Sequence, residues 1–347
     1  MNKISVIGLD LAKDLFQVHG VDERGRAVVR RQLKRREVLA FFANLEPCLV
    51  GLEACGGCHY WAREIGKLGH TVKAMAPQFV RPYVKSQKND LADAEAICEA
   101  VARPTMRFVS VKTVDQQSIL QLHRARQLLT QMRVGLSNHM RALLIEYGIA
   151  LPKGVKALPE RLPAILESAE NGLTDTARAL LAVLDTQYRS LCAQAVQVEA
   201  RIHAWHRQNE ASLRLSEIPG VGVLTATALV GSIGDAKAFR NGRQLAAFLG
   251  LVPQQRSSGG REKLLGITKR GDGYVRTLLV HGARAVIRGV RIRQRAGRPV
   301  DPWLAALLTR AHPNKVAVAQ AAKVARIAWS LLARERTYTV PTTACAA

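Results

Sequence analysis

Two long heptad patterns in the middle of the chain constrain its fold more than any other feature. Apolar side chains spaced alternately by three and four residues lie on one face of a helix, so each pattern predicts one long helix. The first pattern has leucines at every seventh residue, namely Leu122, Leu129, Leu136 and Leu143, with Ile119, Met140 and Tyr147 on the neighbouring track. Two long helices of this kind predict an antiparallel coiled-coil arm or a dimerisation element, although an ordinary helical hairpin would give the same pattern.

Arg126 and Arg133 interrupt the first pattern, and the stretch from Pro152 to Pro163 predicts a break after it. The second pattern begins near Thr174 and runs through Ala177, Leu181, Leu184, Tyr188, Leu191, Ala195, Val198, Ile202 and Trp205. With 347 residues, the chain has room for further domains on both sides of this region. We therefore expect an α/β domain over residues 1–105, a helical arm over 106–210, a helical C-terminal domain over 211–336 and a disordered tail over 337–347.

The first domain has the pattern of a mixed sheet covered by helices. Strands are predicted near residues 3–9, 15–21, 26–32, 48–52 and 71–76, and helices near 35–44, 59–68 and 90–102. Three strands joined by short loops, followed by alternating helices and strands, fit this arrangement.

Acidic residues occur where these elements begin or end. Asp10 follows the apolar run of residues 5–9, and Glu53 follows the apolar run of residues 49–52. Asp90 and Asp93 open an alanine-rich helix, and their spacing of three places both carboxylates on one face. A single Asp at a strand end is more often a turn former, but four acids in such positions suggest a shared site.

Net charge indicates a polyanionic partner. There are 51 Lys and Arg residues against 27 Asp and Glu, a formal charge of +24 at pH 7. Nucleic acid is the polyanion that most often accounts for such a charge. No hydrophobic run appears long enough to span a membrane, and the chain starts in a strand without a signal peptide, so we expect a cytoplasmic protein with no membrane partner.

Residues 218–229 have the form of a helix-hairpin-helix turn. Gly220 and Gly222 would allow a tight turn whose backbone N–H groups approach a phosphate at the start of the following helix. Such contacts bind the nucleic-acid backbone and not the bases. The alternative is a tight turn with a purely structural role.

A serine-containing loop follows, within a strongly basic stretch. Ser257 and Ser258 precede Gly259, and cationic side chains surround them in the sequence: Arg256, Arg261, Lys269, Arg270 and Arg276. Phosphoryl transfer needs cations that neutralise charge on the phosphate oxygens and orient the nucleophile. The final predicted helix, residues 314–336, carries Val318, Ala322, Ala325, Trp329 and Leu332 on its expected buried face.

These motifs together resemble one known family. The matching segments are Gly8 to Lys13, Glu53-Ala54, Lys88 to Ala94, Ile218 to Gly222, Gly250 to Pro253, Ser257 to Gly259 and Lys269 to Asp272. In this order they resemble the transposases of the bacterial insertion-sequence family numbered one hundred and ten. The resemblance covers nearly the whole chain.

The resemblance implies a fold, a reaction and partners. It implies a ribonuclease-H-like, or RuvC-like, N-terminal domain whose acids Asp10, Glu53, Asp90 and Asp93 bind Mg²⁺, since magnesium takes hard oxygen ligands. It also implies a serine nucleophile, placed at Ser258, that cuts and rejoins DNA strands through a phosphoserine link. The further expectations are a structured guide RNA encoded by the element, a homo-oligomer (dimer or tetramer) whose site draws on two protomers, and work at the bacterial nucleoid. The expected nucleic-acid-binding residues are Lys88, Gly220, Gly222, Arg256, Lys269, Arg270 and Arg276.

Other functions remain open from the sequence alone. A Holliday-junction-type nuclease using metal-activated water would share the four acids. A sugar-kinase or chaperone-type ATPase would share the segment Gly8 to Lys13 but would need a second nucleotide-binding half. A DNA-binding structural protein would leave the acids unexplained.

The thiols suggest one additional expectation. Cys55, Cys58 and His59 match a c-type haem attachment pattern, but that chemistry requires export, so reduced cytosolic thiols are favoured. Their position beside Glu53 makes Cys55 and Cys58 possible targets of thiol modification.

Overall fold

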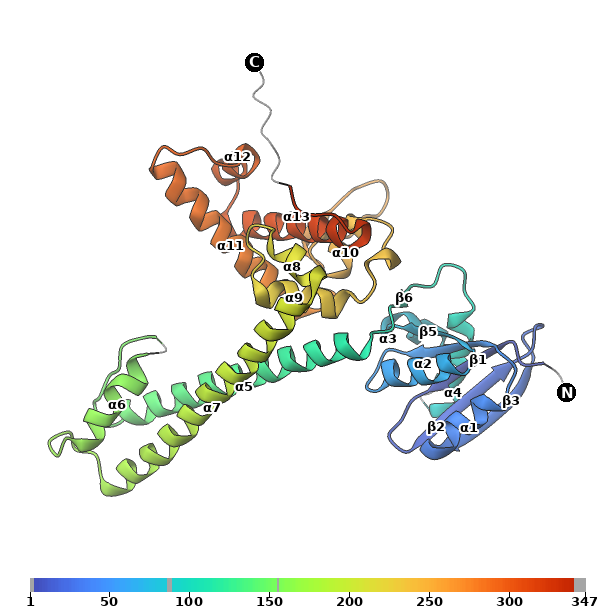
Figure 1. Cartoon of the computed structure of the whole chain (residues 1–347), viewed down its shortest axis with the longest axis horizontal. Coiled ribbons are helices and arrows are strands. Elements are labelled where there is room, and N and C mark those ends of the chain that lie inside the picture. Colours follow the sequence, from blue (N-terminus) through green and yellow to red (C-terminus); the bar gives the residue numbers. More distant parts are fainter. Residues whose placement is uncertain (1–2, 86–88, 155, 340–347) are drawn as a thin grey trace, which may run out of the picture. The chain divides into compact units, whose positions relative to one another are not determined.

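A computed structural model describes residues 3–85, 89–154 and 156–339 (Figure 1). The chain divides into two compact units. The first comprises Met1–Val114 with Ile233–Ala238, and the second comprises Asp115–Ser232 with Phe239–Ala347. The second unit thus holds both the long helices and most of the C-terminal region.

A six-stranded mixed sheet forms the first unit. Its strands are β1 (Val6–Asp10), β2 (Leu15–Val21), β3 (Ala27–Lys34), β4 (Leu49–Glu53), β5 (Thr71–Met75) and β6 (Phe108–Val109). Their order is β3-β2-β1-β4-β5-β6, with β1, β4 and β5 mutually parallel and β2, β3 and β6 antiparallel to their neighbours. The mixed α/β architecture expected from the sequence is confirmed, and it is compatible with a ribonuclease-H-like fold.

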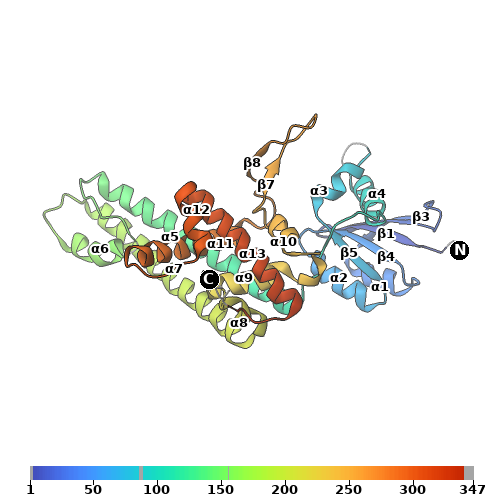
Figure 2. The same ribbon diagram turned by 90° about the horizontal axis from the view of Figure 1, so that it is seen from above.

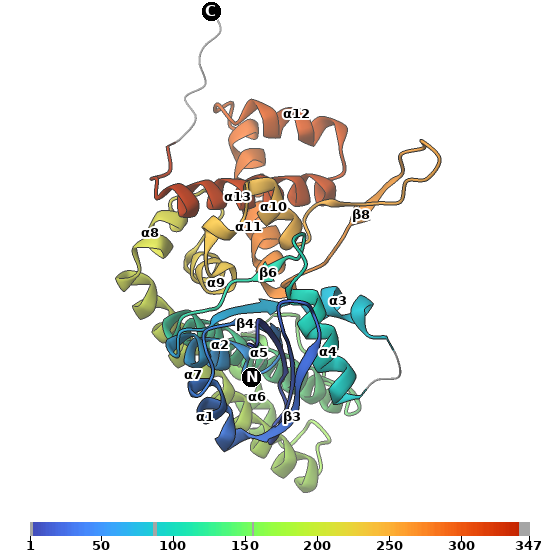
Figure 3. The ribbon, with the colours of Figure 1, turned by 90° about the vertical axis from the view of Figure 1, so that its right-hand side faces the viewer.

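Helices cover both faces of this sheet (Figure 3). On one face, α1 (Val38–Ala43, preceded by the 3-10 turn Arg35–Glu37) and α2 (Cys58–Lys67) pack over a core that includes Ile7, Leu9 and Trp61. On the other face lie α3 (Pro77–Val80), the 3-10 turn Arg81–Tyr83 and α4 (Asp90–Val101). Because successive residues of a strand point to opposite faces, Gly8 and Asp10 of β1 point to the α4 face.

Two glycines allow α4 to lie directly on the sheet. Gly8 and Gly51 are partners in the parallel β1–β4 register. A Cβ at Gly8 would lie 2.1 Å from the Ala94 carbonyl oxygen of α4, and a Cβ at Gly51 would lie 2.8 Å from Cβ of Val101. No side chain fits between helix and sheet at these points. The position of α4, and of the acids at its start, therefore depends on the two glycines.

In the second unit, α5 (Val114–Ile145) and α7 (Asp175–Gln208) form an antiparallel pair, with α6 (Ala157–Glu167) near their connection (Figure 1). Trp205 Nε1 donates to Asp115 at 2.7 Å, and Arg126 Nε donates to Glu199 at 2.6 Å. All nine predicted apolar positions of α7 are buried or half-buried, which confirms its amphipathic pattern. Coiled-coil supercoiling of the pair stays a prediction.

Two details of this region differ from expectation. Tyr147 lies after the end of α5 and is 38% exposed, so it does not extend the first apolar track. The predicted break is shorter than expected, because α6 begins at Ala157 and contains Pro163. Leu158 and Leu162 of this helix are fully buried with Met140 of α5, and this packing stabilises a helix that its prolines disfavour.

The C-terminal region is mainly helical. It contains α8 (Glu210–Ser216), α9 (Val223–Ile233), the 3-10 turn Ala236–Ala238, α10 (Gly242–Phe248), α11 (Gly273–Arg295), α12 (Pro302–Arg310) and α13 (Pro313–Arg334). Between α10 and α11, β7 (Pro253–Gln255) and β8 (Leu264–Ile267) form an antiparallel hairpin that extends from the helices (Figure 2). From the sequence alone, only a loop was predicted here.

The buried face of the last helix, α13, was predicted only in part. Ala325 is buried as predicted, but the other buried residues include Ala317, Ala321, Val324, Ala328 and Leu331, whereas Val318, Ala322, Trp329 and Leu332 are only half-buried. The difference arises because α8, α10, α11 and α12 all contact α13, so burial is not confined to one stripe. Within the described residues, α13 is also the one helix long and apolar enough to cross a membrane, contrary to the expectation that no run reaches this length, and it packs here as a core helix.

Candidate active-site residues

Asp10 and Glu53 are the last residues of the adjacent parallel strands β1 and β4. The register pairs Leu9 with Leu52, so the two acids follow at neighbouring positions on the α4 face. Both are half-buried at this edge of the sheet.

Asp90 and Asp93 lie in the first turn of α4. Asn89 caps the helix by accepting a hydrogen bond from the Ala92 N–H at 2.7 Å. Carboxylates at a helix N-terminus are favoured by the helix dipole, which offsets part of their mutual repulsion.

The electrostatics of Asp10 indicate that the other three acids lie within range of its charge. Burial, followed by the charges of Asp93, Asp90 and Glu53, raises the pKa of Asp10 to about 6. Among the described residues, no three His, Cys, Asp or Glu side chains are grouped closely enough to hold a metal ion as they stand. The all-carboxylate chemistry fits a hard divalent cation, but a cation would need the side chains to move closer together.

Replacement of Asp10 by Asn should stabilise the protein in metal-free buffer above pH 6. Between about pH 4 and pH 6 the folded protein keeps a proton on Asp10 that the unfolded chain has lost. The free energy of unfolding therefore falls as pH rises through this range, and it stays at the lower value above pH 6. After allowance for solvent screening, we expect the variant to gain roughly 1 kcal/mol at pH 8 and nothing at pH 3. Urea unfolding at both pH values measures this difference. An equal effect at the two pH values would contradict it.

Cys55 is a poorer target for thiol modification than its sequence position suggested. Desolvation, together with Cys58 and the carboxylates of Glu53 and Asp10, raises the pKa of Cys55 to about 11. Burial also raises the pKa of Cys58. Because the thiolate is the reactive form, both thiols are held in their less reactive state.

Ser258 lies at the tip of the β7–β8 hairpin. The tip is the turn Ser258-Gly259-Gly260-Arg261, in which Ser258 and Arg261 form a β-bridge. Gly259 and Gly260 have φ values of +56° and +74°, the backbone that a tight hairpin turn requires and that glycine adopts without strain.

The two neighbouring serines differ in their hydrogen bonds. The Ser257 hydroxyl accepts from Gln255 Nε2 at 2.9 Å and from the Lys263 N–H at 3.4 Å. The Ser258 hydroxyl is exposed and has no hydrogen-bond partner in the described part of the chain. Ser258 is therefore the more available of the two.

The base of the hairpin is fixed by backbone contacts. A Cβ at Gly250 would lie 2.2 Å from the Arg270 carbonyl oxygen, and one at Gly271 would lie 2.0 Å from that of Phe248. The half-buried Arg276 donates to the Leu249 and Arg270 carbonyl oxygens at 3.1 and 2.9 Å. Its Nη1 thus supports the base of the hairpin, and nucleic-acid binding by Arg276 stays a prediction.

The predicted helix-hairpin-helix turn connects α8 and α9. Gly220 has φ +87°. Its backbone also packs closely against Gly282 of α11, because a Cβ at Gly282 would lie 1.9 Å from the Gly220 carbonyl oxygen. This contact gives Gly220 a structural role. Gly222 is exposed with open space around its Cα. Nucleic-acid binding at this turn stays a prediction.

The remaining predicted cations are mostly accessible. Arg256, Lys269 and Arg270 are exposed around the hairpin, with Lys269 in the left-handed region at φ +54°. Lys88 lies outside the described residues.

One basic surface was missed in the sequence analysis. Four exposed arginines of α11, spaced by four, three and four residues, share one helix face: Arg284, Arg288, Arg291 and Arg295. None forms an ion pair within the described ranges, and Arg284 donates to Asn314 at 3.3 Å. A search for helical periodicity in charge, as well as in hydrophobicity, would have found this surface.

The comparisons with known proteins agree with these features. A family model described as "Transposase IS116/IS110/IS902 family" matches residues 212–296, and a model of the DEDD transposases of IS110, described as "Transposase", matches residues 7–149. The first match covers the serine hairpin and the second covers all four acids. Together they describe a transposase, an enzyme class that acts on DNA.

Relatives that span nearly the whole chain identify the family. A probable family 20 transposase of Pseudomonas aeruginosa is 49% identical over 96% of this chain and 98% of its own length. The transposase of insertion sequence element IS1111A of Coxiella burnetii is 44% identical over 97% and 92%, and that of IS1328 of Yersinia enterocolitica is 43% identical over 95% and 97%. The chain therefore belongs to the IS110 family of insertion-sequence transposases.

Proposed function

We propose that this transposase cuts and rejoins DNA strands through Ser258, with the acidic set of Asp10, Glu53, Asp90 and Asp93 acting on the same phosphate. The observation that carries the proposal is the position of Ser258 at an exposed hairpin tip, with an unengaged hydroxyl and Arg261 as its partner in the β-bridge. A nucleophile of this kind must reach a phosphodiester bond without obstruction.

The reaction is a transesterification. Ser258 Oγ attacks phosphorus, the Oγ–P bond forms as one sugar–phosphate bond breaks, and the serine proton is released while the leaving sugar oxygen gains one. A DNA hydroxyl then attacks the phosphoserine and regenerates the serine. Arg256 and Arg261, which lie nearest to Ser258 in the hairpin, stabilise the charge on the phosphate oxygens during both steps. Lys269 and Arg270 lie at the base of the hairpin and are proposed to contact the nucleic-acid backbone farther from the tip.

The acidic set is proposed to hold Mg²⁺. Its four acids occur in the order Asp, Glu, Asp, Asp, which agrees with the letters DEDD in the name of the matching model. When bound, the cation supplies positive charge that polarises the phosphate. Mg²⁺ should therefore raise the melting temperature of the wild-type protein and leave that of Asp10→Asn unchanged, which tests the metal without an activity assay.

The partners are proposed from the family resemblance and the net charge. We propose that a structured guide RNA of the element selects the target DNA by base pairing, and that the protein works as a dimer or tetramer at the nucleoid. The exposed arginines of α11 support contact with a phosphate backbone, which such assemblies require.

A covalent-trapping assay tests the proposal. Purified protein is incubated with DNA of its element's ends, the associated RNA and Mg²⁺, and the products are resolved on a denaturing gel. We expect a protein–DNA adduct that is absent with Ser258→Ala and present with Ser257→Ala. If the DNA is cleaved without any adduct, and this cleavage is abolished by Asp10→Ala, the result would instead support the alternative of a Holliday-junction-type nuclease that uses activated water.

A further inference from the structure

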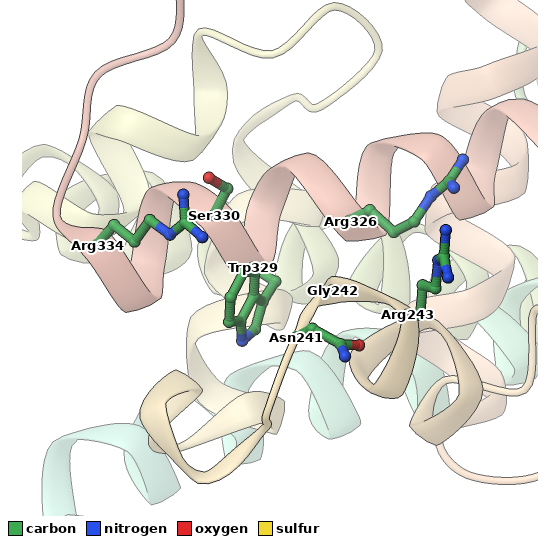
Figure 4. Close-up of a pocket in the computed structure, with 7 residues that line it drawn as sticks. All are labelled: Asn241, Gly242, Arg243, Arg326, Trp329, Ser330 and Arg334. Atoms are coloured by element: carbon green, nitrogen blue, oxygen red, sulfur yellow. The ribbon is translucent and has the colours of Figure 1, made fainter.

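A basic groove between α10 and α13 lies outside all the residues assigned so far (Figure 4). Its volume is about 340 Å³. It is lined by Asn241, Gly242, Arg243, Arg326, Trp329, Ser330 and Arg334. We call it the α10–α13 groove.

Packing fixes both walls of the groove. A Cβ at Gly242 would lie 2.9 Å from the Arg326 Cα, so the backbones of α10 and α13 meet there. Asn241 accepts a hydrogen bond from the Gln244 N–H at 3.0 Å, which holds the start of α10. Trp329 Nε1 donates to the Phe239 carbonyl oxygen at 3.1 Å, which orients the indole ring. The groove is thus formed before any ligand arrives.

Its charged side chains gather at two points. Arg243 and Arg326 extend side by side at one end, and Arg334 lies toward the other, with its guanidinium 5.5 Å from the Trp329 ring centroid (Figure 4). None of the three forms an ion pair with a carboxylate within residues 3–85, 89–154 and 156–339. Adjacent like charges without a counter-charge are unfavourable, and an anionic ligand would relieve this repulsion.

We propose that the α10–α13 groove binds the sugar–phosphate backbone of a nucleic-acid strand, as a contact additional to the catalytic site; the inference rests on the proposed function. Arg326 and Arg334 are eight residues apart on one helix, so about 12 Å of axis separates them. This length is enough for the two arginines to contact different phosphates of one strand, which rises about 3.4 Å per nucleotide along the duplex axis. Arginines bind phosphates strongly through charge-assisted hydrogen bonds, and contacts of this kind position the strand without reading its sequence.

A salt-dependent binding measurement tests the proposal. The variant carries Arg243→Ala, Arg326→Ala and Arg334→Ala, and its control carries Arg161→Ala, Arg201→Ala and Arg207→Ala, three exposed arginines elsewhere in the same unit. Both lose the same net charge. Fluorescence anisotropy with a labelled DNA duplex and with a labelled single-stranded RNA, in EDTA, gives the affinity at several salt concentrations.

We expect the groove variant to bind one of these probes about tenfold more weakly than the control does, and the probe more affected identifies the strand. The slope of log affinity against log salt should fall in magnitude by about 0.9 per lost contact on duplex DNA, or about 0.7 on a single strand. Equal losses in the two variants would overturn the inference and leave the proposed function intact. Labelled polyglutamate serves as a third probe; if the groove variant loses affinity for polyglutamate but not for either nucleic acid, the inference is overturned in favour of an acidic protein segment. A wild-type protein that binds neither probe would overturn both proposals.

Discussion

The Ser258→Ala variant is expected to lose DNA cleavage by at least about 10⁴-fold, because removal of a covalent nucleophile usually leaves only residual catalysis. The exposed hydroxyl of Ser258 at the hairpin tip is the group that forms the new bond to phosphorus in the proposed reaction. Single-turnover cleavage of labelled DNA, with the RNA and Mg²⁺ present, measures the effect.

Ser257→Ala is the matched control for this variant. The Ser257 hydroxyl accepts hydrogen bonds from Gln255 and Lys263 and thereby supports the hairpin, so its loss should reduce the rate far less. Neither variant should change DNA affinity, and Ser258→Ala should not change thermal stability. If the two variants lose the same activity, the assignment of Ser258 is wrong.

The second large effect is expected at Gly8, where alanine should destabilise the first unit by about 3 kcal/mol or more. The new Cβ would lie 2.1 Å from the Ala94 carbonyl oxygen and 2.4 Å from the Cys98 backbone nitrogen, and backbone atoms cannot move aside cheaply. Relief requires α4 to shift away from β1, which would also separate Asp90 and Asp93 from Asp10. Urea unfolding, with hydrogen exchange of the α4 amides, measures both consequences.

Gly56→Ala is the matched control in the same unit. No atom lies within 4 Å of the Cβ that alanine would introduce at this position. This control should cost less than about 1 kcal/mol. Equal destabilisation by the two substitutions, or unchanged exchange of α4 in Gly8→Ala, would contradict the role given to Gly8.

The elements of the first unit could be predicted because their sequence signals are local. Alternating or continuous apolar runs between turn residues marked β1 to β5, and Asn89 with the following acids marked the start of α4. The close contact of Gly8 with α4 could not be predicted, since it depends on residues about 90 positions apart in the sequence. The short β6 has too few residues to give a pattern.

The C-terminal region was harder to predict for physical reasons. The β7–β8 hairpin is exposed on both faces, so no apolar alternation marks its strands. The face of α13 was misjudged because four helices contact it. The choice between Ser257 and Ser258 depends on side-chain hydrogen bonds, which sequence spacing does not reveal. The internal use of Arg276 likewise follows from where the chain folds back on itself.

The most direct test of the account is to identify the residue joined to DNA. The covalent adduct formed by the wild-type protein would be digested with nuclease and protease, and the modified peptide sequenced by mass spectrometry. We expect a nucleotide attached to Ser258. A nucleotide on Ser257 or on another residue, or cleaved DNA with no modified peptide, would contradict it.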